Sequence, residues 1–314
     1  MENQIIANPQ RLKNDISRMF QLVNVPFEDA ELVADCLVKA DLMGVKSHGI
    51  QRAKLYMDGI AKGGTTPECH MKEESNFPGG ALYDAKGALG IVVAERAMRI
   101  AIEKAKVNGI GITGVHNSNH CGTMRYYTDM AAAEGMIGFA TSNAASMMVP
   151  FGSREPFFGT NPIAVSIPTG KEPLVLDMAT SVVARGKIII ANKNGESIPE
   201  GWAIDKDGNS TTDSAAALEG FVLPFGGPKG SGLAMIADIL CGVLVNGAYG
   251  PHVNYPYATP EEPMDCGHVF VAIDISAFRN LESFLSGMDR YCEEIKQLKP
   301  VPGMEEVMIP GMSS

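Results

Sequence analysis

The sequence predicts an α/β fold built around a mixed β-sheet. From residue 110 onward, short runs rich in Ile and Val alternate with stretches whose apolar residues recur at helical spacing. The runs at residues 163–167 and 174–176 are joined by too few residues for a crossover helix, so we expect this pair to be antiparallel. With 314 residues, 45% of them apolar and 20% charged, the chain is long enough for one large domain or two interleaved ones.

The opening third of the chain is predicted to be helical. Asp29 is expected to cap a helix whose apolar stripe continues to Ala40 and which ends at Gly44. A second helix spans about residues 50–60 and is followed by a glycine-rich turn. A third spans residues 92–107 and has an apolar stripe at helical spacing.

Strands, a hairpin and two further helices follow. The segment Asp205-Lys-Asp-Gly-Asn209 predicts a tight hairpin. Residues 233–245 are mostly apolar but contain Asp238 and Gly242, so we expect a buried helix rather than a membrane span. The predicted strands are residues 110–115, 137–141, 163–167, 174–176 and 269–275, and the predicted helices are residues 232–245 and 281–298.

The charge balance excludes several classes of partner. The formal net charge is −10 and no basic block occurs, which disfavours nucleic acids and anionic membranes. The N-terminus lacks the features of a secretory signal, and no apolar run approaches the ~18 residues that span a bilayer. The six cysteines show no paired spacing, so we expect reduced thiols and a cytoplasmic protein.

Gly109, Gly111 and Gly114 match the G-x-G-x-x-G spacing of dinucleotide-binding loops. In that motif a strand precedes the glycines and a helix follows, so that the helix N-terminus faces the pyrophosphate. Here a predicted helix precedes the glycines, and they lie within the β-run itself. We therefore interpret the segment as a buried strand whose small residues allow close packing.

A stronger phosphate-binding candidate is the segment Phe225-Gly-Gly-Pro-Lys229-Gly-Ser-Gly232. We expect its glycines to expose backbone N–H groups, the following helix to add partial positive charge, and Lys229 to add a full charge. A glycine separates the Ser from the Lys and no Mg²⁺-binding acid is evident, so the segment differs from a P-loop. It suits the anionic part of a dinucleotide. A glycine turn that only starts a helix is the alternative.

Residues 46–56 bring three polar side-chain types together. Ser47 is expected to cap a helix near residue 50, which leaves His48 at the helix N-terminus. Arg52 and Tyr56 follow at i,i+4 spacing and so share a face. Arg offers the fork that a carboxylate prefers, and His transfers protons near neutral pH. The alternative is an ordinary capped helix with a surface Arg and an interfacial Tyr.

Two histidines flank an Asn-rich segment directly after the first β-run, in His116-Asn-Ser-Asn-His120-Cys-Gly122. Loops at strand ends are where α/β proteins place their chemistry, which favours an acid–base role for one histidine. The spacing H-x-x-x-H binds zinc when a helix brings the two rings together, but the polar residues between them predict a loop. A loop histidine with satisfied hydrogen bonds is the remaining alternative.

Two turns beside predicted strands also carry polar side chains. Thr160 and Asn161 precede one strand, and we expect their side chains to be free for a ligand. Asp177 follows another strand, where a carboxylate accepts hydrogen bonds from ribose hydroxyls or orients a histidine. The alternative is a helix N-cap, with Asp177 or Thr180 starting a helix through Val183.

Five segments, in order along the chain, resemble those of the type-2 malate/L-lactate dehydrogenase family. They are SHGIQR at 47–52, NSNHCG at 117–122, MMVPFGSREPFFGTNP at 147–162, VLDMATSVVARGK at 175–187 and GGPKGSGLAMIADILCGVL at 226–244. The family includes ureidoglycolate, sulfolactate and diketogulonate enzymes, and the reductase of cyclic imines such as piperideine-2-carboxylate. The segment SIPEGWAIDK at 197–206 is most similar to ureidoglycolate dehydrogenases, although other members carry it too.

The resemblance implies a homodimer with a mixed-sheet, non-Rossmann nicotinamide-binding domain interleaved with a helical substrate and dimerisation part. We expect residues 1–125 and 265–314 to form the substrate and dimerisation part, and residues 126–264 the nicotinamide-binding part. The proton donor matches His48 in some members and His120 in others. The expected substrate-binding residues are Ser47, Arg52, Tyr56 and Thr160, and the expected cofactor-binding residues are Ala144, Asp177, Met178, Ala179, Pro228 and Lys229; no metal site is expected.

These observations predict hydride transfer between a nicotinamide and C2 of a small 2-hydroxy or 2-oxo acid, such as malate, lactate or ureidoglycolate. NAD is the expected cofactor and NADP the alternative. We expect Arg52 to hold the carboxylate, His48 to move the proton of the C2 oxygen and His120 to orient that oxygen. The rival function is a zinc-dependent hydrolase built on His116 and His120 with Cys266 or His268. The third possible function is a sensor that binds the cofactor but does not turn over a substrate.

Overall fold

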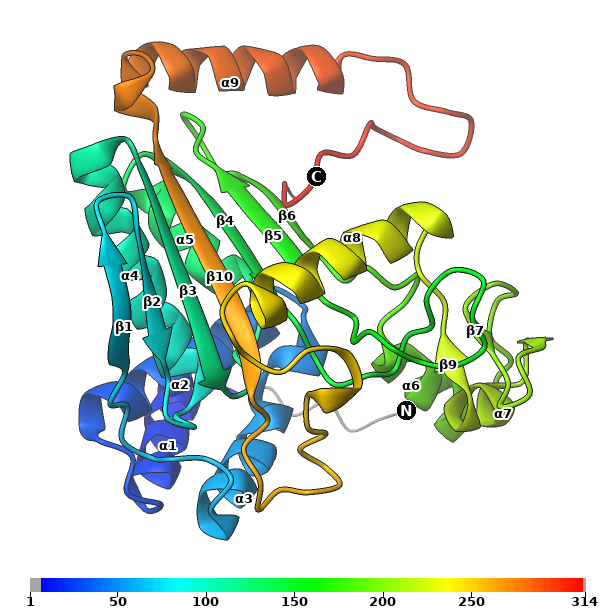
Figure 1. Cartoon of the computed structure of the whole chain (residues 1–314). Coiled ribbons are helices and arrows are strands. Elements are labelled where there is room, and N and C mark those ends of the chain that lie inside the picture. Colours follow the sequence, from blue (N-terminus) through cyan, green and yellow to red (C-terminus); the bar gives the residue numbers. More distant parts are fainter. Residues whose placement is uncertain (1–6, 313–314) are drawn as a thin grey trace.

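The computed structural model describes residues 7–312, and its centre is a seven-stranded sheet (Figure 1). The strands, in sheet order, are β1 (Lys72–Phe77), β2 (Gly80–Asp84), β3 (Ile110–Ser118), β10 (Cys266–Asp274), β4 (Met136–Ser142), β5 (Ile163–Ile167) and β6 (Leu174–Met178). Strands β2 and β3 are parallel, whereas the other neighbouring pairs of this sheet are antiparallel. The predicted mixed sheet is confirmed, including the antiparallel pairing of β5 with β6.

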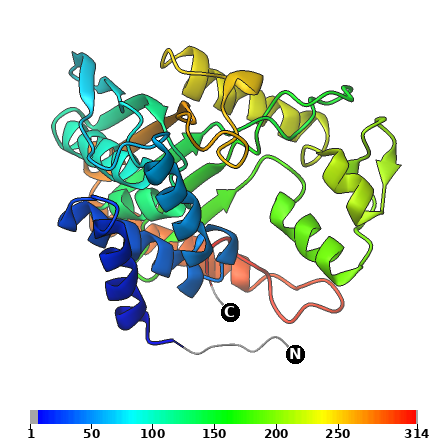
Figure 2. The same cartoon turned by 90° about the horizontal axis from the view of Figure 1, so that it is seen from below.

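Helices cover both faces of this sheet. Helices α4 and α5 pack on one face, while α8 and the π-helical turn after it lie across the other (Figure 1). The N-terminal helices α1 and α2 pack on each other, and α2 contacts α4, so they extend the first helical layer (Figure 2). The helices are α1 (Pro9–Gln21), α2 (Phe27–Leu42), α3 (Ala53–Lys62), α4 (Gly90–Asn108), α5 (Arg125–Ala133), α8 (Pro228–Asp238), its π-helical turn (Ile239–Val243) and α9 (Leu281–Lys296).

A smaller lobe follows β6 in the sequence. Its elements are α6 (Arg185–Asn194), β7 (Ala203–Ile204), β8 (Ser210–Thr211), α7 (Ser214–Glu219) and β9 (Phe221–Val222), and its three strands form an antiparallel sheet in the order β8-β7-β9. The predicted hairpin joins β7 to β8, and it is held by Asp205, whose carboxylate accepts hydrogen bonds from the N–H groups of Asp207 and Asn209, both at 2.9 Å. The lobe has its own small apolar cluster around Ile188 and Val222.

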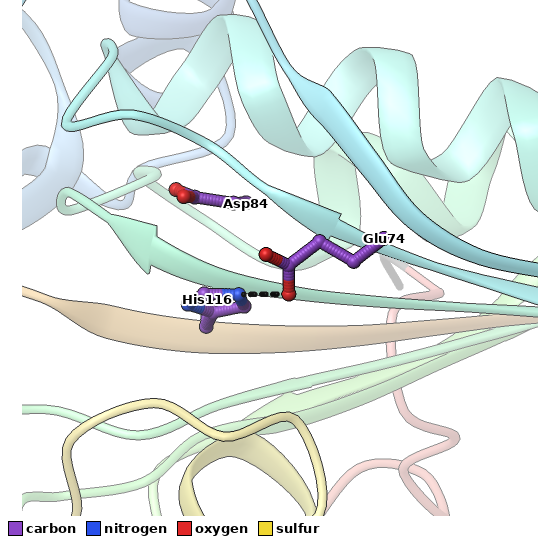
Figure 3. A group of neighbouring side chains, drawn as sticks. All are labelled: Glu74, Asp84 and His116. Atoms are coloured by element: carbon purple, nitrogen blue, oxygen red, sulfur yellow. Dashed lines mark hydrogen bonds and ion pairs between the residues drawn. The ribbon is translucent and has the colours of Figure 1, made fainter.

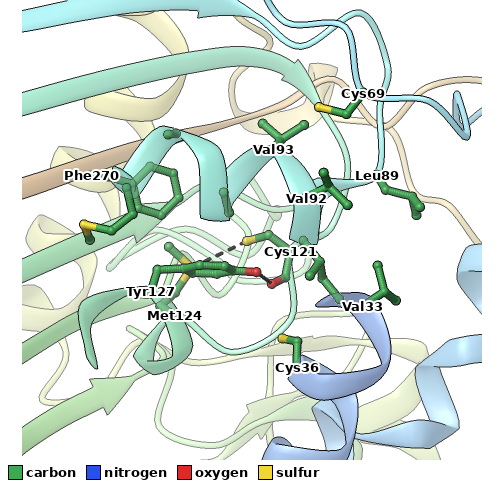
Figure 4. Packing of buried hydrophobic residues seen from close by; sticks show 14 of the residues in the cluster. Val33, Cys36, Cys69, Leu89, Val92, Val93, Cys121, Met124, Tyr127 and Phe270 are labelled. Atoms are coloured by element: carbon green, nitrogen blue, oxygen red, sulfur yellow. Dashed lines mark hydrogen bonds between the residues drawn. The ribbon is translucent and has the colours of Figure 1, made fainter. Parts of the chain in front are cut away.

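The main core lies between the sheet and helices α1, α2, α4 and α5 (Figure 4). Tyr127 on α5 and Phe270 on β10 are fully buried, and their rings pack edge to face with centroids 5.6 Å apart. The Tyr127 phenol donates to the backbone oxygen of Cys121. This bond ties the segment after β3 to the core, and that segment carries His120. All six cysteines are buried with free thiols.

Two helix predictions are wrong in detail. Helix α2 begins at Phe27, so Asp29 lies within its first turn instead of capping it. The Asp29 carboxylate pairs with the Arg96 guanidinium on α4 at 2.8 Å, a tertiary contact that local sequence does not show. Helix α8 begins at Pro228, earlier than predicted, and its outer face is not buried, because Met235 and Ile236 are 48% and 54% exposed.

The glycines at 109–114 agree with a packed strand and not with a dinucleotide-binding loop. Gly109 ends α4 with φ 79°, in the left-handed region that glycine accepts readily. Gly111 lies in β3 where a Cβ would come within 1.9 Å of the Ala101 backbone oxygen on α4. The glycines therefore let helix and strand approach each other. None of the described helices is both long and apolar enough to cross a bilayer.

Candidate active site

Three of the four predicted substrate-binding residues, Ser47, Arg52 and Tyr56, lie next to the start of α3. The fourth, Thr160, is bonded to Thr180 among the cofactor-side segments. Ser47 and His48 lie in a 3₁₀ turn, and a second turn that ends at Arg52 leads into α3. The His48 and His120 rings stack with centroids 5.5 Å apart, and the Tyr56 hydroxyl lies 2.6 Å from His120 Nδ1. The structure thus brings together a histidine from each of two segments that are distant in the sequence.

The predicted capping role of Ser47 is wrong. Its hydroxyl lies 2.9 Å from His48 Nδ1, and the carboxylate of Asp41 accepts from the N–H of Ile50 at 2.9 Å instead. Gly49 makes this possible, since a Cβ there would lie 2.0 Å from Asp41 Oδ1. Ser47 is therefore free to fix the orientation of the His48 ring.

Arg52 is held from two sides. Its Nε donates to the backbone oxygen of Ser47 at 2.7 Å, and its Nη1 donates to the Tyr257 hydroxyl. Within residues 7–312, Nη2 has no hydrogen-bond or ion-pair partner, which leaves one edge of the guanidinium for a carboxylate. Sequence reasoning missed Tyr257, because it lies in an irregular segment 205 residues away along the chain.

The surroundings keep both imidazoles neutral. Burial, reinforced by the Arg52 charge, lowers the pKa of His48 from 6.5 to about 4. Burial, together with the charges of Arg52, His48 and His268, holds the pKa of His120 well below its usual range. Burial also raises the pKa of Tyr56 well above 10, so its phenol stays protonated.

The hydrogen bonds of His120 fix its tautomer. The N–H of Gly122 donates to His120 Nδ1 at 3.3 Å, so this nitrogen is an acceptor and the Tyr56 hydroxyl donates to it as well. In a neutral ring the remaining proton then lies on Nε2. His120 therefore presents an N–H donor from the ring edge opposite Tyr56.

The predicted cofactor-side segments meet around Thr180. Its N–H and hydroxyl donate to the backbone oxygen of Thr160 at 2.8 and 3.0 Å, and its own backbone oxygen accepts from the N–H of Phe225 at 3.1 Å. Thr180 follows Asp177, Met178 and Ala179 in the sequence. These bonds therefore place the end of β6, the turn at Thr160 and the turn before α8 side by side.

Asn161, predicted to have a side chain free for a ligand, is instead fully buried and engaged. Its Oδ1 accepts from the N–H of Ala144 at 3.1 Å, and its Nδ2 donates to the backbone oxygen of Ala234 at 3.0 Å. The backbone around Ala144 is thereby fixed against α8. Asn161 is thus an organiser of the cofactor side, and its φ of 25° lies in a region that Asn tolerates better than most residues.

Most of the predicted backbone cradle before α8 is already occupied by hydrogen bonds within the turn. The N–H groups of Gly227, Lys229, Gly230 and Ser231 donate to carbonyl oxygens of residues 224–227 at 2.9–3.4 Å. They are therefore already used within the turn. The Lys229 side chain, however, is exposed and has no ion-pair partner among residues 7–312, so it is the cation this turn offers to a phosphate.

Asp177 links the two sides of the site. Its Oδ2 accepts from the N–H of Arg125 at 2.9 Å, at the start of α5 and close after His120 in the sequence. The proposed helix start at Asp177 or Thr180 is wrong, because β6 runs to Met178 and the next helix begins at Arg185. The exposed Asp177 carboxylate can accept hydrogen bonds from ribose hydroxyls and the Lys229 ammonium can donate to a phosphate, so these two groups fit a nicotinamide dinucleotide.

The rival zinc arrangement is not assembled. His116 Nε2 lies 3.0 Å from Glu74 Oε2, and among the described residues the one group with metal-ligand spacing is Glu74, Asp84 and His116 (Figure 3). His120 does not belong to this group. The Lys86 ammonium already lies 2.6 Å from Asp84 Oδ2, so the group is an ion-pair cluster.

The other residues named for the zinc site are engaged elsewhere. His268 lies between two serines, 2.9 Å from Ser118 Oγ and 2.9 Å from Ser142 Oγ, and is fully buried. The Cys266 thiol donates to the backbone oxygen of Ser118 at 3.5 Å. Among residues 7–312, neither side chain joins His116 at metal-ligand spacing, so the ligand set expected for the zinc hydrolase is not brought together there.

Comparison with known proteins identifies the family. A model of the malate/L-lactate dehydrogenase family matches residues 7–314. A malate dehydrogenase of Pyrococcus horikoshii is 43% identical, over 99% of this chain and 88% of the relative. The solved sulfolactate dehydrogenase of Methanocaldococcus jannaschii superposes with a TM-score of 0.93 at 41% identity, over 98% of this chain and 88% of that one.

The cofactor named for relatives varies. An NAD(+)-linked ureidoglycolate dehydrogenase of Escherichia coli O157:H7 is 38% identical over 90% of this chain and 81% of its own length, and a sulfolactate dehydrogenase that is 34% identical is named for NADP(+). The matches span nearly the whole chain and agree with the paired histidines and the dinucleotide-compatible donors. The chain therefore belongs to the malate/L-lactate dehydrogenase family and is an NAD(P)-dependent 2-hydroxyacid dehydrogenase.

Proposed function

We propose that this enzyme interconverts a small 2-hydroxy acid and its 2-oxo acid with NAD as cofactor, and that His48 moves the proton. The observation that carries the proposal is the pair of neutral imidazoles stacked beside an arginine with a free edge. The bound nicotinamide supplies the hydride chemistry. The chain supplies orientation, proton transfer and stabilisation of charge on the C2 oxygen.

Arg52 binds the substrate carboxylate in this scheme. Its Nε is fixed by Ser47, so the guanidinium plane is set before substrate arrives, and its unpaired edge offers two N–H donors to a carboxylate. Thr160 and Tyr56 complete the substrate side. Tyr56 acts through His120, to which its hydroxyl is bonded.

The two histidines divide the work on the C2 oxygen. His120 has its proton on Nε2, which suits a donor that orients and polarises the oxygen. His48 can donate from Nδ1 to Ser47 Oγ, which leaves the lone pair of Nε2 to accept the hydroxyl proton during oxidation. Burial is the larger cause of the low pKa of His48 and the Arg52 charge the smaller one. A bound carboxylate offsets the Arg52 charge, so we expect the pKa of His48 to rise above about 4 in the complex.

The cofactor side provides one anionic and one cationic anchor. The Asp177 carboxylate would accept from ribose hydroxyls, and the Lys229 ammonium would meet a phosphate. Ala144, Met178, Ala179 and Pro228 would line the dinucleotide through their backbone. An exposed carboxylate beside the ribose repels a 2′-phosphate, which is our reason for proposing NAD over NADP.

A dehydrogenase screen with both cofactors tests the function. We expect turnover of malate first, since the relative that is 43% identical is a malate dehydrogenase, and then of sulfolactate, ureidoglycolate and lactate. NAD should give the higher kcat/KM. Turnover of none of these acids, or a strong preference for NADP, would contradict the respective part of the proposal.

We further propose a homodimer, with residues 1–125 and 265–314 as the substrate and dimerisation part and residues 126–264 as the nicotinamide-binding part. An exposed apolar face in the nicotinamide-binding part supports the assembly and would extend the interface beyond the dimerisation part. It consists of Met235, Ile236, Ile239, Val243 and Leu244, which are 48–60% exposed along α8, its π-helical turn and the residue after that turn. Such a face is usually covered by another surface. Sedimentation analysis should show a dimer, and Ile236→Lys should yield monomers if this face lies in the interface.

A further inference from the structure

The segment before β10 is a compact loop with closed ends. The N–H of Asn254 donates to the backbone oxygen of Met264 at 3.0 Å, and the N–H groups of Ala258 and Thr259 donate to the backbone oxygen of Tyr255 at 2.9 and 3.2 Å. These bonds give residues 254–264 the form of an Ω-loop, a kind of loop that is often functional. Figure 1 shows it hanging below β10 toward α3.

This loop is anchored next to the catalytic histidines. The N–H of Met264 donates to Asn119 Oδ1 at 3.1 Å, one residue before His120. A narrow pocket lies between the loop and α3, and its lining includes Tyr56, His120, Pro256 and Pro260. The loop therefore packs beside Tyr56 and His120, and its Tyr257 reaches Arg52.

The loop also packs closely on the turn after α3. A Cβ on Gly64 would lie 2.4 Å from the backbone oxygen of Pro260 and 2.6 Å from that of Glu262. Any larger residue at position 64 must push the loop away from α3. The position of the loop is thus adjustable by one substitution that lies outside the substrate-binding set.

Within this loop, Tyr257 is the residue whose side chain is bonded to Arg52. Its hydroxyl accepts a hydrogen bond from Arg52 Nη1, so its own proton is not used in that bond. No acceptor for this proton occurs in the part of the chain that the structure describes, and the Tyr257 ring is 55% exposed. A phenol in this state presents a donor beside the guanidinium.

We propose that Tyr257 is a second carboxylate-binding residue, which the loop of residues 254–264 delivers to the substrate held by Arg52. The inference rests on the proposed role of Arg52. One carboxylate oxygen would accept from the guanidinium and from the Tyr257 hydroxyl together, because that hydroxyl is bonded to Nη1 and so lies beside the unpaired Nη2. Arg52 stays in place without Tyr257, since Ser47 holds its Nε at 2.7 Å.

Tyr257→Phe is the direct test, because it removes the donor and keeps the ring. A hydrogen bond to a charged group is worth enough for us to expect a rise of about 10- to 100-fold in substrate KM and in the Kd of oxamate, a small analogue of 2-oxo acids, measured calorimetrically on the NADH complex. The Kd of NADH should not change. Tyr255→Phe is the matched control, since its ring lies in the same loop, 5.4 Å from that of Tyr257, and it should leave both constants unchanged.

A second variant tests delivery by the loop. Gly64→Ala should raise the oxamate Kd in the same direction, and it should add little to Tyr257→Phe in the double variant, because both act on one contact. An unchanged or lower oxamate Kd in Tyr257→Phe would overturn the inference, since the phenol would then only occupy the place of substrate. A wild-type enzyme that neither turns over 2-hydroxy acids nor binds oxamate would overturn the proposed function as well.

Discussion

The two halves of the active site are built in different ways. On the substrate side, Tyr56 is bonded to His120 and Ser47 to His48, and burial shifts the pKa of both histidines and of Tyr56. On the cofactor side, Lys229 and Asp177 are exposed, and their positions follow from backbone bonds around Thr180. The groups to which we assign the chemistry are preorganised, whereas those to which we assign cofactor binding remain exposed.

Packing explains this difference. The substrate side packs against the main core. Tyr56 and Cys121, the residue after His120, both belong to that core. The cofactor side borders the small lobe, whose apolar cluster has far fewer members. Side chains backed by a large, close-packed core keep one orientation, which proton transfer requires.

The largest effect we predict tests the substrate side. His48→Asn should lower kcat by about two to four orders of magnitude, the usual contribution of general acid–base catalysis, and leave the NADH Kd unchanged. Steady-state kinetics and an NADH fluorescence titration measure both quantities. The variant should also lose the acidic limb of the kcat–pH profile, because that limb reports the pKa of His48 in the complex.

His120→Asn provides the comparison for this assignment. It should reduce kcat and yet retain the acidic limb, because His120 is expected to donate to the C2 oxygen without exchanging its proton. A profile that loses the limb in His120→Asn and keeps it in His48→Asn would reverse the two roles.

The next effect tests the cofactor side. Lys229→Met should weaken NADH binding by about 1–3 kcal/mol, the scale of a charge-assisted hydrogen bond, with little change in kcat at saturating cofactor. Lys193→Met, at another exposed lysine on α6, is the control and should bind NADH normally. Equal NADH affinity in the two variants would remove Lys229 from the phosphate site.

A third prediction concerns Gly111 in β3, which belongs to neither the substrate side nor the cofactor side of the active site. Gly111→Ala should lower the free energy of unfolding by about 1–3 kcal/mol, because its Cβ meets the Ala101 backbone, and should leave the KM for cofactor nearly unchanged. Gly287→Ala on α9, where a Cβ meets nothing within 4 Å, should be neutral or slightly stabilising. Folded Gly111→Ala protein with a selective loss of cofactor affinity would restore the dinucleotide-loop interpretation.

Periodicity predicted the elements that bury a regular apolar stripe. Helix α4 and strand β5 were predicted closely because their apolar spacing alone is diagnostic. Strand β1 was missed, since the side chains of Lys72–Phe77 are all exposed and its residues are mostly polar or charged. Helix α1 was also missed, although Asn8 and Pro9 give a cap and a first-turn proline.

The sequence suggested which residues belong to the candidate site, but it did not show most of the contacts between them. Sequence motifs singled out Arg52, His48 and His120 as candidates, and the family resemblance assigned them to one site. The bonds of Tyr257 to Arg52, of Asn161 to Ala144 and of Asp29 to Arg96 link residues that local patterns cannot connect. The capping error at Ser47 has the same cause, because Asp41 reaches Ile50 only once the turn between them is formed.

The smallest predicted effect concerns His268, which lies between the substrate side and the cofactor side of the active site. His268 lies between Ser118, two residues before His120, and Ser142, two residues before Ala144. Burial lowers its pKa from 6.5 to about 4. Because the folded pKa lies below the unfolded one, the unfolded chain binds more protons between these values, so stability is present above about pH 6.5 and is lost as pH falls toward 4.

The loss attributable to His268 should be roughly 1 kcal/mol between pH 7.5 and 5.5. Urea unfolding of the wild type and of His268→Gln at both pH values measures it as the difference between their pH dependences. His48 and His120 contribute equally to both proteins and cancel in that difference. His268→Gln is expected to be less stable at either pH, since the packing around two serines is disturbed, but its stability should fall less steeply on acidification. Equal pH dependence would mean that His268 keeps its usual pKa in the folded protein, and that the serines between the two sides accommodate a charged ring.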